Sequence, residues 1–174
     1  ANATGINSGA IGPEAKALGD DSFAVGTRAQ ALADYSTALG NQSTAEKAYD
    51  LAAGYNAIAS GGQSTAVGFG SKSTGNASNA IGGSSLAEGD FSIAIGQESK
   101  TAAGKNFATA LGYKAQANGW ASFAQGSYAV ASGDGSISIG DSSSATGESS
   151  IAVGKKANAT GINSGAIGPE AKAL

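Results

Sequence analysis

Three features of the sequence predict an all-β fold, a solenoid of short parallel strands. A phrase of the form Ser-x-Ala-apolar-Gly recurs along all 174 residues, the glycines that end it are evenly spaced, and small residues alternate with larger ones inside it. Ten of the eleven intervals equal the fourteen positions from Gly12 to Gly26, and the interval from Gly96 to Gly112 is longer by two. Short, regular repeats are typical of solenoids, in which each repeat is one coil stacked on its neighbours. The phrase-ending glycines are Gly12, Gly26, Gly40, Gly54, Gly68, Gly82, Gly96, Gly112, Gly126, Gly140, Gly154 and Gly168.

Each coil is predicted to hold two strands and two turns. In "PEAKALGDDSFAVG" (13–26), residues 15–17 and 22–25 alternate small and larger side chains with the period of a strand. Residues 18–21 and 26–28 form the turns, where glycine adopts positive φ at little cost. Small residues such as Ala15, Ala17 and Ala24 therefore face a thin interior.

Larger aliphatic side chains at the position before each phrase-ending glycine are predicted to point out of the coil. They form a stripe along the rod, interrupted by Gln125. Exposed to water, such a stripe would promote aggregation, so burial against identical stripes on a rotation axis is expected. Because one coil has so little apolar surface of its own, folding and assembly are predicted to be one event.

Composition excludes several function classes. The chain has no Cys and no His, so disulfides, Cys/His zinc sites, thiol nucleophiles and Ser-His dyads are impossible. A pI near 4.8 argues against nucleic acid as a partner. No apolar run is long enough to span a membrane. We expect a protein that is not an enzyme and has no cofactor or metal.

The repeat closely resembles that of YadA-like heads in trimeric autotransporter adhesins of Gram-negative bacteria. The resemblance rests on "STAVGFGSKS" (64–73), "SIAIGQES" (92–99) and "SIAVGKKANA" (150–159), and it covers the whole chain, 1–174, as a single head fragment of about eleven coils. It implies a left-handed parallel β-roll and a homotrimer. It also implies display outside the cell on a stalk anchored in the outer membrane, and attachment to a host extracellular-matrix protein or cell-surface receptor.

With three chains implied, the outward stripe becomes the predicted trimer core. An amide of Gln125 on that axis has to be hydrogen bonded by its copies, by water or by an ion, which makes it either a specificity device or a tolerated polar residue. The predicted trimer-core residues are Ile11, Val25, Leu39, Val67, Ile81, Ile95, Leu111, Gln125, Ile139, Val153 and Ile167.

Residues 1–18 and 157–174 are identical. Their offset equals ten coils of the ordinary length and one of the longer length, so the chain is interpreted as one unit of a longer duplication within a fibre. Signal, stalk and anchor segments are expected beyond its ends.

Two coils depart from the pattern. In 41–54 the turn glycine is replaced by Lys47, the serine by Asp50 and the aliphatic residue by Ala53. We expect this coil to be locally relaxed, with a functional bulge as the alternative. The coil 97–112 is the longer one, and its two additional residues, near 103–106, are predicted to bulge from a turn.

Aromatic and cationic residues gather in the sequence near that bulge and are the candidate ligand-binding residues. Exposed aromatics beside cations are typical of interface anchors, but rings can also stack from coil to coil and stiffen the rod. Tyr35 with Tyr49, and Tyr55 with Phe69, are predicted to be stacking pairs of this second kind. A structural spacer without a ligand remains the alternative function. The candidate ligand-binding residues are Lys100, Lys105, Asn106, Phe107, Tyr113, Lys114, Trp120 and Tyr128.

Overall fold

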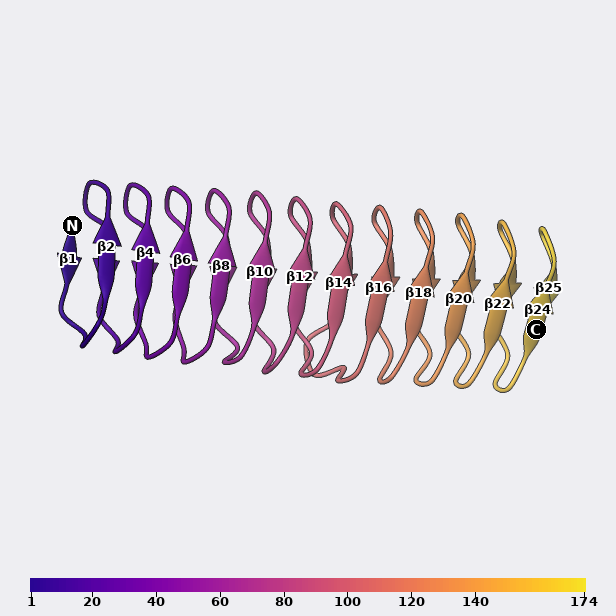
Figure 1. Ribbon diagram of the computed structural model, residues 1–174. Coiled ribbons are helices and arrows are strands. Elements are labelled where there is room, and N and C mark those ends of the chain that lie inside the picture. The colour runs from indigo at the N-terminus through magenta and orange to yellow at the C-terminus, as the bar shows by residue number, and fades with distance from the viewer.

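The computed structural model describes residues 1–174 as one solenoid of short parallel strands with no helix (Figure 1). Strands alternate between two sheets, so that each coil contributes one strand to each. The 13-stranded sheet contains β1 (Asn2–Ala3), β3 (Lys16–Ala17), β5 (Gln30–Ala31), β7 (Thr44–Ala45), β9 (Ile58–Ala59), β11 (Lys72–Ser73), β13 (Leu86–Ala87), β15 (Lys100–Thr101), β17 (Gln116–Ala117), β19 (Val130–Ala131), β21 (Ser144–Ala145), β23 (Asn158–Ala159) and β25 (Lys172–Ala173).

The 12-stranded sheet takes the longer strand of each coil. It contains β2 (Gly9–Ile11), β4 (Phe23–Val25), β6 (Thr37–Leu39), β8 (Leu51–Ala53), β10 (Thr65–Val67), β12 (Asn79–Ile81), β14 (Ile93–Ile95), β16 (Thr109–Leu111), β18 (Phe123–Gln125), β20 (Ile137–Ile139), β22 (Ile151–Val153) and β24 (Gly165–Ile167). These strands match the predicted ones to within one residue at each end. The prediction of an all-β parallel solenoid is confirmed.

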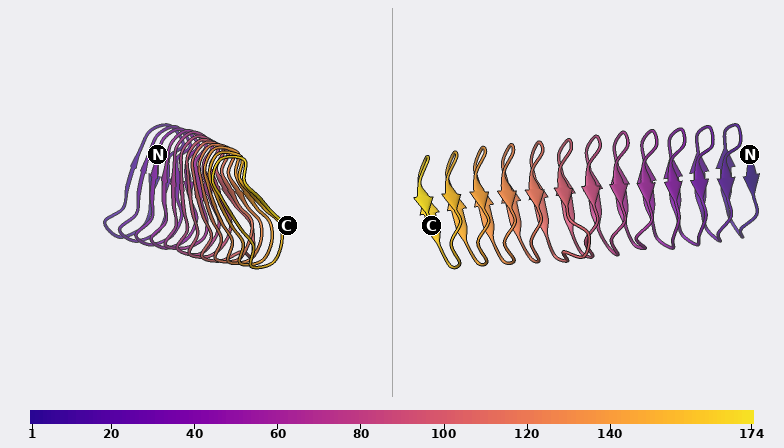
Figure 2. Two further views of the ribbon diagram at one scale, coloured as in Figure 1. Left: turned by 90° about the vertical axis from the view of Figure 1, so that its right-hand side faces the viewer. Right: turned by 180° about the vertical axis from the view of Figure 1, so that it is seen from behind.

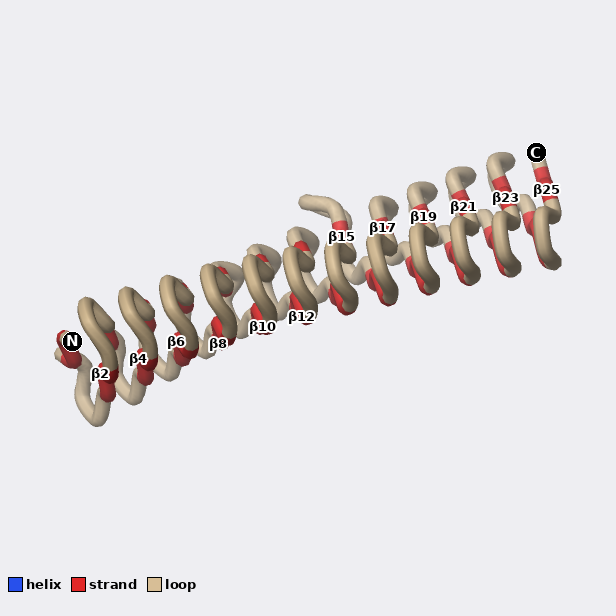
Figure 3. Tube along the Cα trace, turned by 90° about the horizontal axis from the view of Figure 1, so that it is seen from above, coloured by secondary structure: helices blue, strands red, loops and turns tan.

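The winding is left-handed. In Figure 1 the even-numbered strands lie nearer the viewer and run upward, the odd-numbered strands descend behind them, and the chain advances from left to right. Figure 3 places the two sheets on opposite sides of the rod. Seen along the rod in Figure 2, the coils follow one behind another and stay narrow.

Register is kept from coil to coil by the repeat length. Val67 pairs with Ile81 and Ile81 with Ile95, each exactly one ordinary repeat further along the chain, while the longer coil pairs Ile95 with Leu111. Both sheets therefore absorb the insertion without a slip. A slip of one residue would exchange the inward and outward side chains, so the small residues inside fix the register strongly.

Alanine and serine fill the interior, as the alternation predicts. Ala15, Ala17 and Ala24 are fully buried, and Ser22 is 1% exposed. The hydroxyl of Ser22 donates to the carbonyl of Gly19 at 2.7 Å, which satisfies a buried polar group within its own turn. Apart from Asp50 and Thr101, every buried side chain is alanine or serine.

Hydrogen bonds to the Asp50 carboxyl group hold the coil 41–54 in place, so the expectation that this coil is locally relaxed was wrong. The Asp50 side chain is 1% exposed. One carboxyl oxygen accepts hydrogen bonds from the N–H of Gly62 at 3.0 Å and from the N–H and hydroxyl of Ser64 at 2.9 and 2.8 Å; the other accepts from the N–H of Lys47 at 2.9 Å. A carboxyl group in the serine position thus joins two adjacent coils.

Asp50→Ala should therefore destabilise the rod strongly. It leaves three backbone N–H groups without their acceptor, and breaking a buried charged network costs about 3–5 kcal/mol. Thermal unfolding followed by circular dichroism is the measurement. Asp50→Ser, which restores the residue of most other coils, should recover part of the loss. An unchanged melting temperature for Asp50→Ala would contradict a structural role for this network.

The outer faces of the two sheets differ in polarity. The predicted stripe does point outward from the 12-stranded sheet: Ile81 and Ile95 are 38% and 40% exposed in the single chain. A second, interrupted apolar column, which was not predicted from the sequence, runs beside it at the first residue of the strands and is apolar in six of the twelve. The outer face of the 13-stranded sheet is mainly polar. Members of the second column are Phe23, Leu51, Ile93, Phe123, Ile137 and Ile151.

Candidate functional site

The turns form two edges along the rod, and the candidate residues lie on these edges. We call the turns that lead from an odd-numbered to an even-numbered strand the lower edge, and those that lead from an even-numbered to an odd-numbered strand the upper edge, after their places in Figure 1. Nearly every turn places one residue that is not glycine at positive φ, such as Phe107 at 61° and Tyr128 at 56°. From the sequence, positive φ in the turns is expected at glycine. This backbone leaves the aromatic side chains on the outside of the rod.

The lower-edge cluster consists of Phe91, Lys105, Asn106, Phe107, Trp120 and Asp134. Phe91 and Phe107 stack with ring centroids 5.3 Å apart, and Phe107 meets Trp120 edge to face at 6.0 Å. Phe107 and Trp120 are each about half exposed. The side-chain oxygen of Asn106, which is partly buried, accepts a hydrogen bond from the N–H of Asp90 at 3.1 Å.

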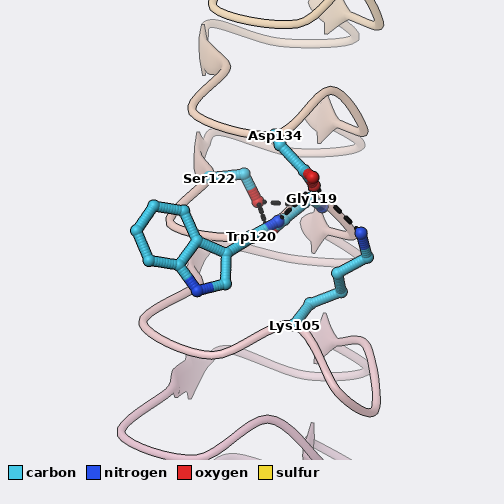
Figure 4. A network of polar contacts seen from close by, with 5 residues as sticks. All are labelled: Lys105, Gly119, Trp120, Ser122 and Asp134. Carbon is cyan, nitrogen blue, oxygen red and sulfur yellow. Dashed lines mark hydrogen bonds and ion pairs between the residues drawn. The ribbon is translucent and has the colours of Figure 1, made fainter.

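Asp134 organises the backbone beneath Trp120. Its carboxylate accepts the N–H of Trp120 at 2.7 Å and pairs with the Lys105 ammonium at 2.9 Å (Figure 4). The Trp120 N–H and the Lys105 ammonium both favour the charged form, which lowers the pKa of Asp134 below its ordinary value. Figure 4 shows the indole of Trp120 directed away from this pair. The ring is fixed at its backbone and free at its outer face.

The upper-edge cluster consists of Glu98, Tyr113, Lys114 and Tyr128. The two tyrosines meet edge to face with centroids 5.3 Å apart. The Lys114 ammonium lies 5.2 Å from the Tyr113 ring centroid and 5.7 Å from that of Tyr128, and 3.4 Å from the Glu98 carboxylate. Cation–π contacts and an ion pair hold this lysine over both rings.

The eight candidate residues do not form one patch, which corrects the sequence reading. Phe107 and Trp120 lie on the lower edge, whereas Tyr113 and Tyr128 lie on the upper edge. Residues separated by about half a coil fall on opposite edges, so proximity in sequence is misleading. Lys100 belongs to neither cluster, because it lies on the outer face of the 13-stranded sheet, 3.5 Å from Glu88. Phe91 was missed, although it occupies the same turn position as Phe107 one coil earlier.

The stacking pairs predicted from sequence are confirmed. The centroids of Tyr35 and Tyr49 are 5.0 Å apart, and those of Tyr55 and Phe69 are 5.4 Å apart, with the rings of each pair within 8° of parallel. Neither aromatic cluster lines a hollow. The one pocket of the rod lies near its N-terminal end, beside Glu14, Lys16 and Arg28. Neither aromatic cluster contributes a residue to that pocket.

A family model decides what this rod is. The YadA head domain repeat (2 copies) matches the chain in ten overlapping segments, which together span residues 3–171 apart from 100 and 101. The chain belongs to the YadA head family. It is therefore an adhesin-type head domain, from a family of structural adhesins rather than of enzymes. The two residues left unmatched within this span, Lys100 and Thr101, form β15 and lie shortly before the insertion near 103–106.

Two further findings concern the head. A search of the curated proteins finds no match to it. No segment of the head is a helix long and apolar enough to cross a bilayer.

Proposed function

We propose that three copies of this head form one rod that is displayed on the bacterial surface, and that the outer surface of the rod attaches the cell to a host. The observation that carries the proposal is the family membership over nearly the whole chain. The target is a cell-surface receptor or an extracellular-matrix protein. Beyond the chain, a stalk and anchor connect the head to the outer membrane.

The apolar face of the 12-stranded sheet supports the trimer. Two parallel columns of aliphatic and aromatic side chains run along this face, and a patch of that length on a monomer would be unusual. A rotation axis facing the sheet buries both columns in every subunit. The predicted trimer-core residues, from Ile11 to Ile167, form one column, and the column of Phe23 and Ile93 forms the other.

The two aromatic clusters support attachment. Large half-exposed rings next to charged groups are what interfaces use as anchors, whereas Ser, Thr and Asn, which make up most other turns, seldom anchor a partner. The candidate ligand-binding residues within the clusters are Lys105, Asn106, Phe107, Tyr113, Lys114, Trp120 and Tyr128. Lys100, on the outer face of the 13-stranded sheet, stays a candidate apart from the clusters. The spacer alternative is favoured by the identical segments 1–18 and 157–174, since duplication lengthens a rod without adding a new surface.

Trp120→Ala combined with Tyr113→Ala tests attachment. We expect adhesion of beads coated with the head to cultured cells and to a panel of matrix proteins to weaken at least tenfold, which corresponds to about 1.4 kcal/mol. Far-UV circular dichroism should stay unchanged, because both rings lie outside the coil. The trimer mass should also persist, because the apolar columns of the 12-stranded sheet hold the subunits together in this proposal.

Tyr55→Ala combined with Phe69→Ala is the matched control. It removes another exposed ring pair from the upper edge and should leave adhesion intact. If the first double variant adheres normally but melts much earlier, the rings are structural supports and the spacer function is favoured.

A further inference from the structure

The two aromatic clusters lie at the same level of the rod although they occupy opposite edges. Trp120 follows Tyr113 by seven positions and precedes Tyr128 by eight, so it lies about half a coil from each. Half a coil corresponds to an axial offset of about 2.4 Å, given the usual spacing of neighbouring strands. Within one chain, however, Trp120 contacts Phe107, and Tyr113 contacts Tyr128. Their spacing in sequence therefore sets the shared level, but no contact within the chain joins the two clusters.

Rotational symmetry brings opposite edges together. When the 12-stranded sheets of three subunits face a common axis, the lower edge of each subunit points one way around that axis and the upper edge points the other way. Every seam between subunits then joins one lower edge to one upper edge. Rotation about the axis leaves the axial level unchanged, so residues at the same level meet across the seam.

We propose that the lower-edge cluster of one subunit meets the upper-edge cluster of the next, so that a second copy of this chain completes the candidate site. This inference rests on the trimer in the proposed function. A ligand that touches both Trp120 and Tyr113 would then contact two subunits within one seam, rather than two remote edges of one chain.

The chemistry of the two clusters fits such a seam. Lys105 is paired with Asp134, and Lys114 with Glu98, so bringing the edges together buries no uncompensated charge. Aromatic pairs contribute beyond the area they bury, and the tyrosine hydroxyls and the indole N–H supply polar groups for a partly wet seam.

The same arrangement occurs a second time along the rod. Tyr35 and Tyr49 stack on the lower edge, and Tyr55 and Phe69 stack on the upper edge. Tyr55 follows Tyr49 by six positions, which again is about half a coil. Contact across a seam predicts that aromatic residues on the two edges lie at the same axial level, and this occurs twice along the rod. Stacking from coil to coil within one chain does not require it.

Cysteine cross-linking tests the seam, because the natural chain has no cysteine. In the head carrying Trp120→Cys and Tyr113→Cys, a short bifunctional thiol reagent at high dilution should convert most chains into covalent trimers on a denaturing gel. Each chain is then linked to both neighbours.

Two controls define the specificity of the link. Trp120→Cys alone should give no covalent trimer, because its three copies lie in three different seams. Trp120→Cys with Tyr55→Cys should also give none, since the two sites are about four and a half coils apart, about 22 Å along the rod. If the first pair does not fold, Phe107→Cys with Lys114→Cys, which also lie about half a coil apart on opposite edges, tests the same seam.

Sedimentation of the untreated variants separates the two proposals. A trimer that yields only monomer bands for both seam pairs overturns the seam and leaves the proposed function standing. A folded monomer overturns the trimer, and with it the seam.

Discussion

Gly140→Ala is expected to disrupt the rod where β20 turns toward β21. Gly140 has φ of +132°, a region open essentially to glycine alone. A Cβ added there would lie 2.5 Å from the carbonyl oxygen and 2.6 Å from the carbonyl carbon of Gly154 in the next coil. Backbone cannot move aside as a side chain does, so the coils must separate and lose hydrogen bonds. We expect a loss of about 4 kcal/mol or more, measured by thermal or denaturant unfolding.

Gly104→Ala is the matched control. Gly104 also has positive φ, +69°, but a Cβ there would meet no atom within 4 Å, because the residue belongs to the bulge of the longer coil. Its cost should be limited to the left-handed backbone, about 1 kcal/mol. Equal losses for the two variants would contradict the prediction that the close contact between coils makes Gly140 necessary.

Periodicity predicted most of the fold because it fixes three things at once. The interval between glycines sets the length of each coil, and the alternation around Ala24 sets which side chains face inward. The small size of the inward residues sets the distance between the two sheets. These are local properties of the chain, and the structure confirms each of them. The Ser-x-Ala phrase was also specific enough to indicate the family.

Features that depend on the position of a residue within the coil were not predicted correctly from the sequence. Phe107 and Tyr113 are near in sequence but lie on opposite edges, and their turns have to be counted through the two-residue insertion to see it. The apolar column of Ile93 was overlooked because Thr and Asn interrupt it. The hydrogen bonds that Asp50 accepts could not be predicted from the sequence. Most of their donors are backbone N–H groups, which nearly every residue has, so the sequence does not indicate which of them the carboxyl group contacts.

Ile95→Asn should weaken the trimer more than any other change on the outer face. Ile95 lies between Ile81 and Leu111 in the predicted core column. Three asparagine side chains would enter an apolar interface, and unsatisfied buried polar groups cost about 1–3 kcal/mol each. We therefore expect a loss of several kcal/mol per trimer. Analytical ultracentrifugation should find dissociation at concentrations where the natural head is trimeric, and its unfolding midpoint should rise with protein concentration.

Gln125→Ile should act in the opposite direction at an equivalent place. Gln125 pairs with Leu111 on one side and Ile139 on the other, so it is the one polar residue among aliphatic neighbours in its part of the column. An isoleucine adds apolar surface to the interface and removes three amides that need partners. The trimer should persist and melt at a higher temperature. If Ile95→Asn and Gln125→Ile change the melting temperature alike, or if the natural head sediments as a folded monomer, this face of the 12-stranded sheet does not lie on the axis.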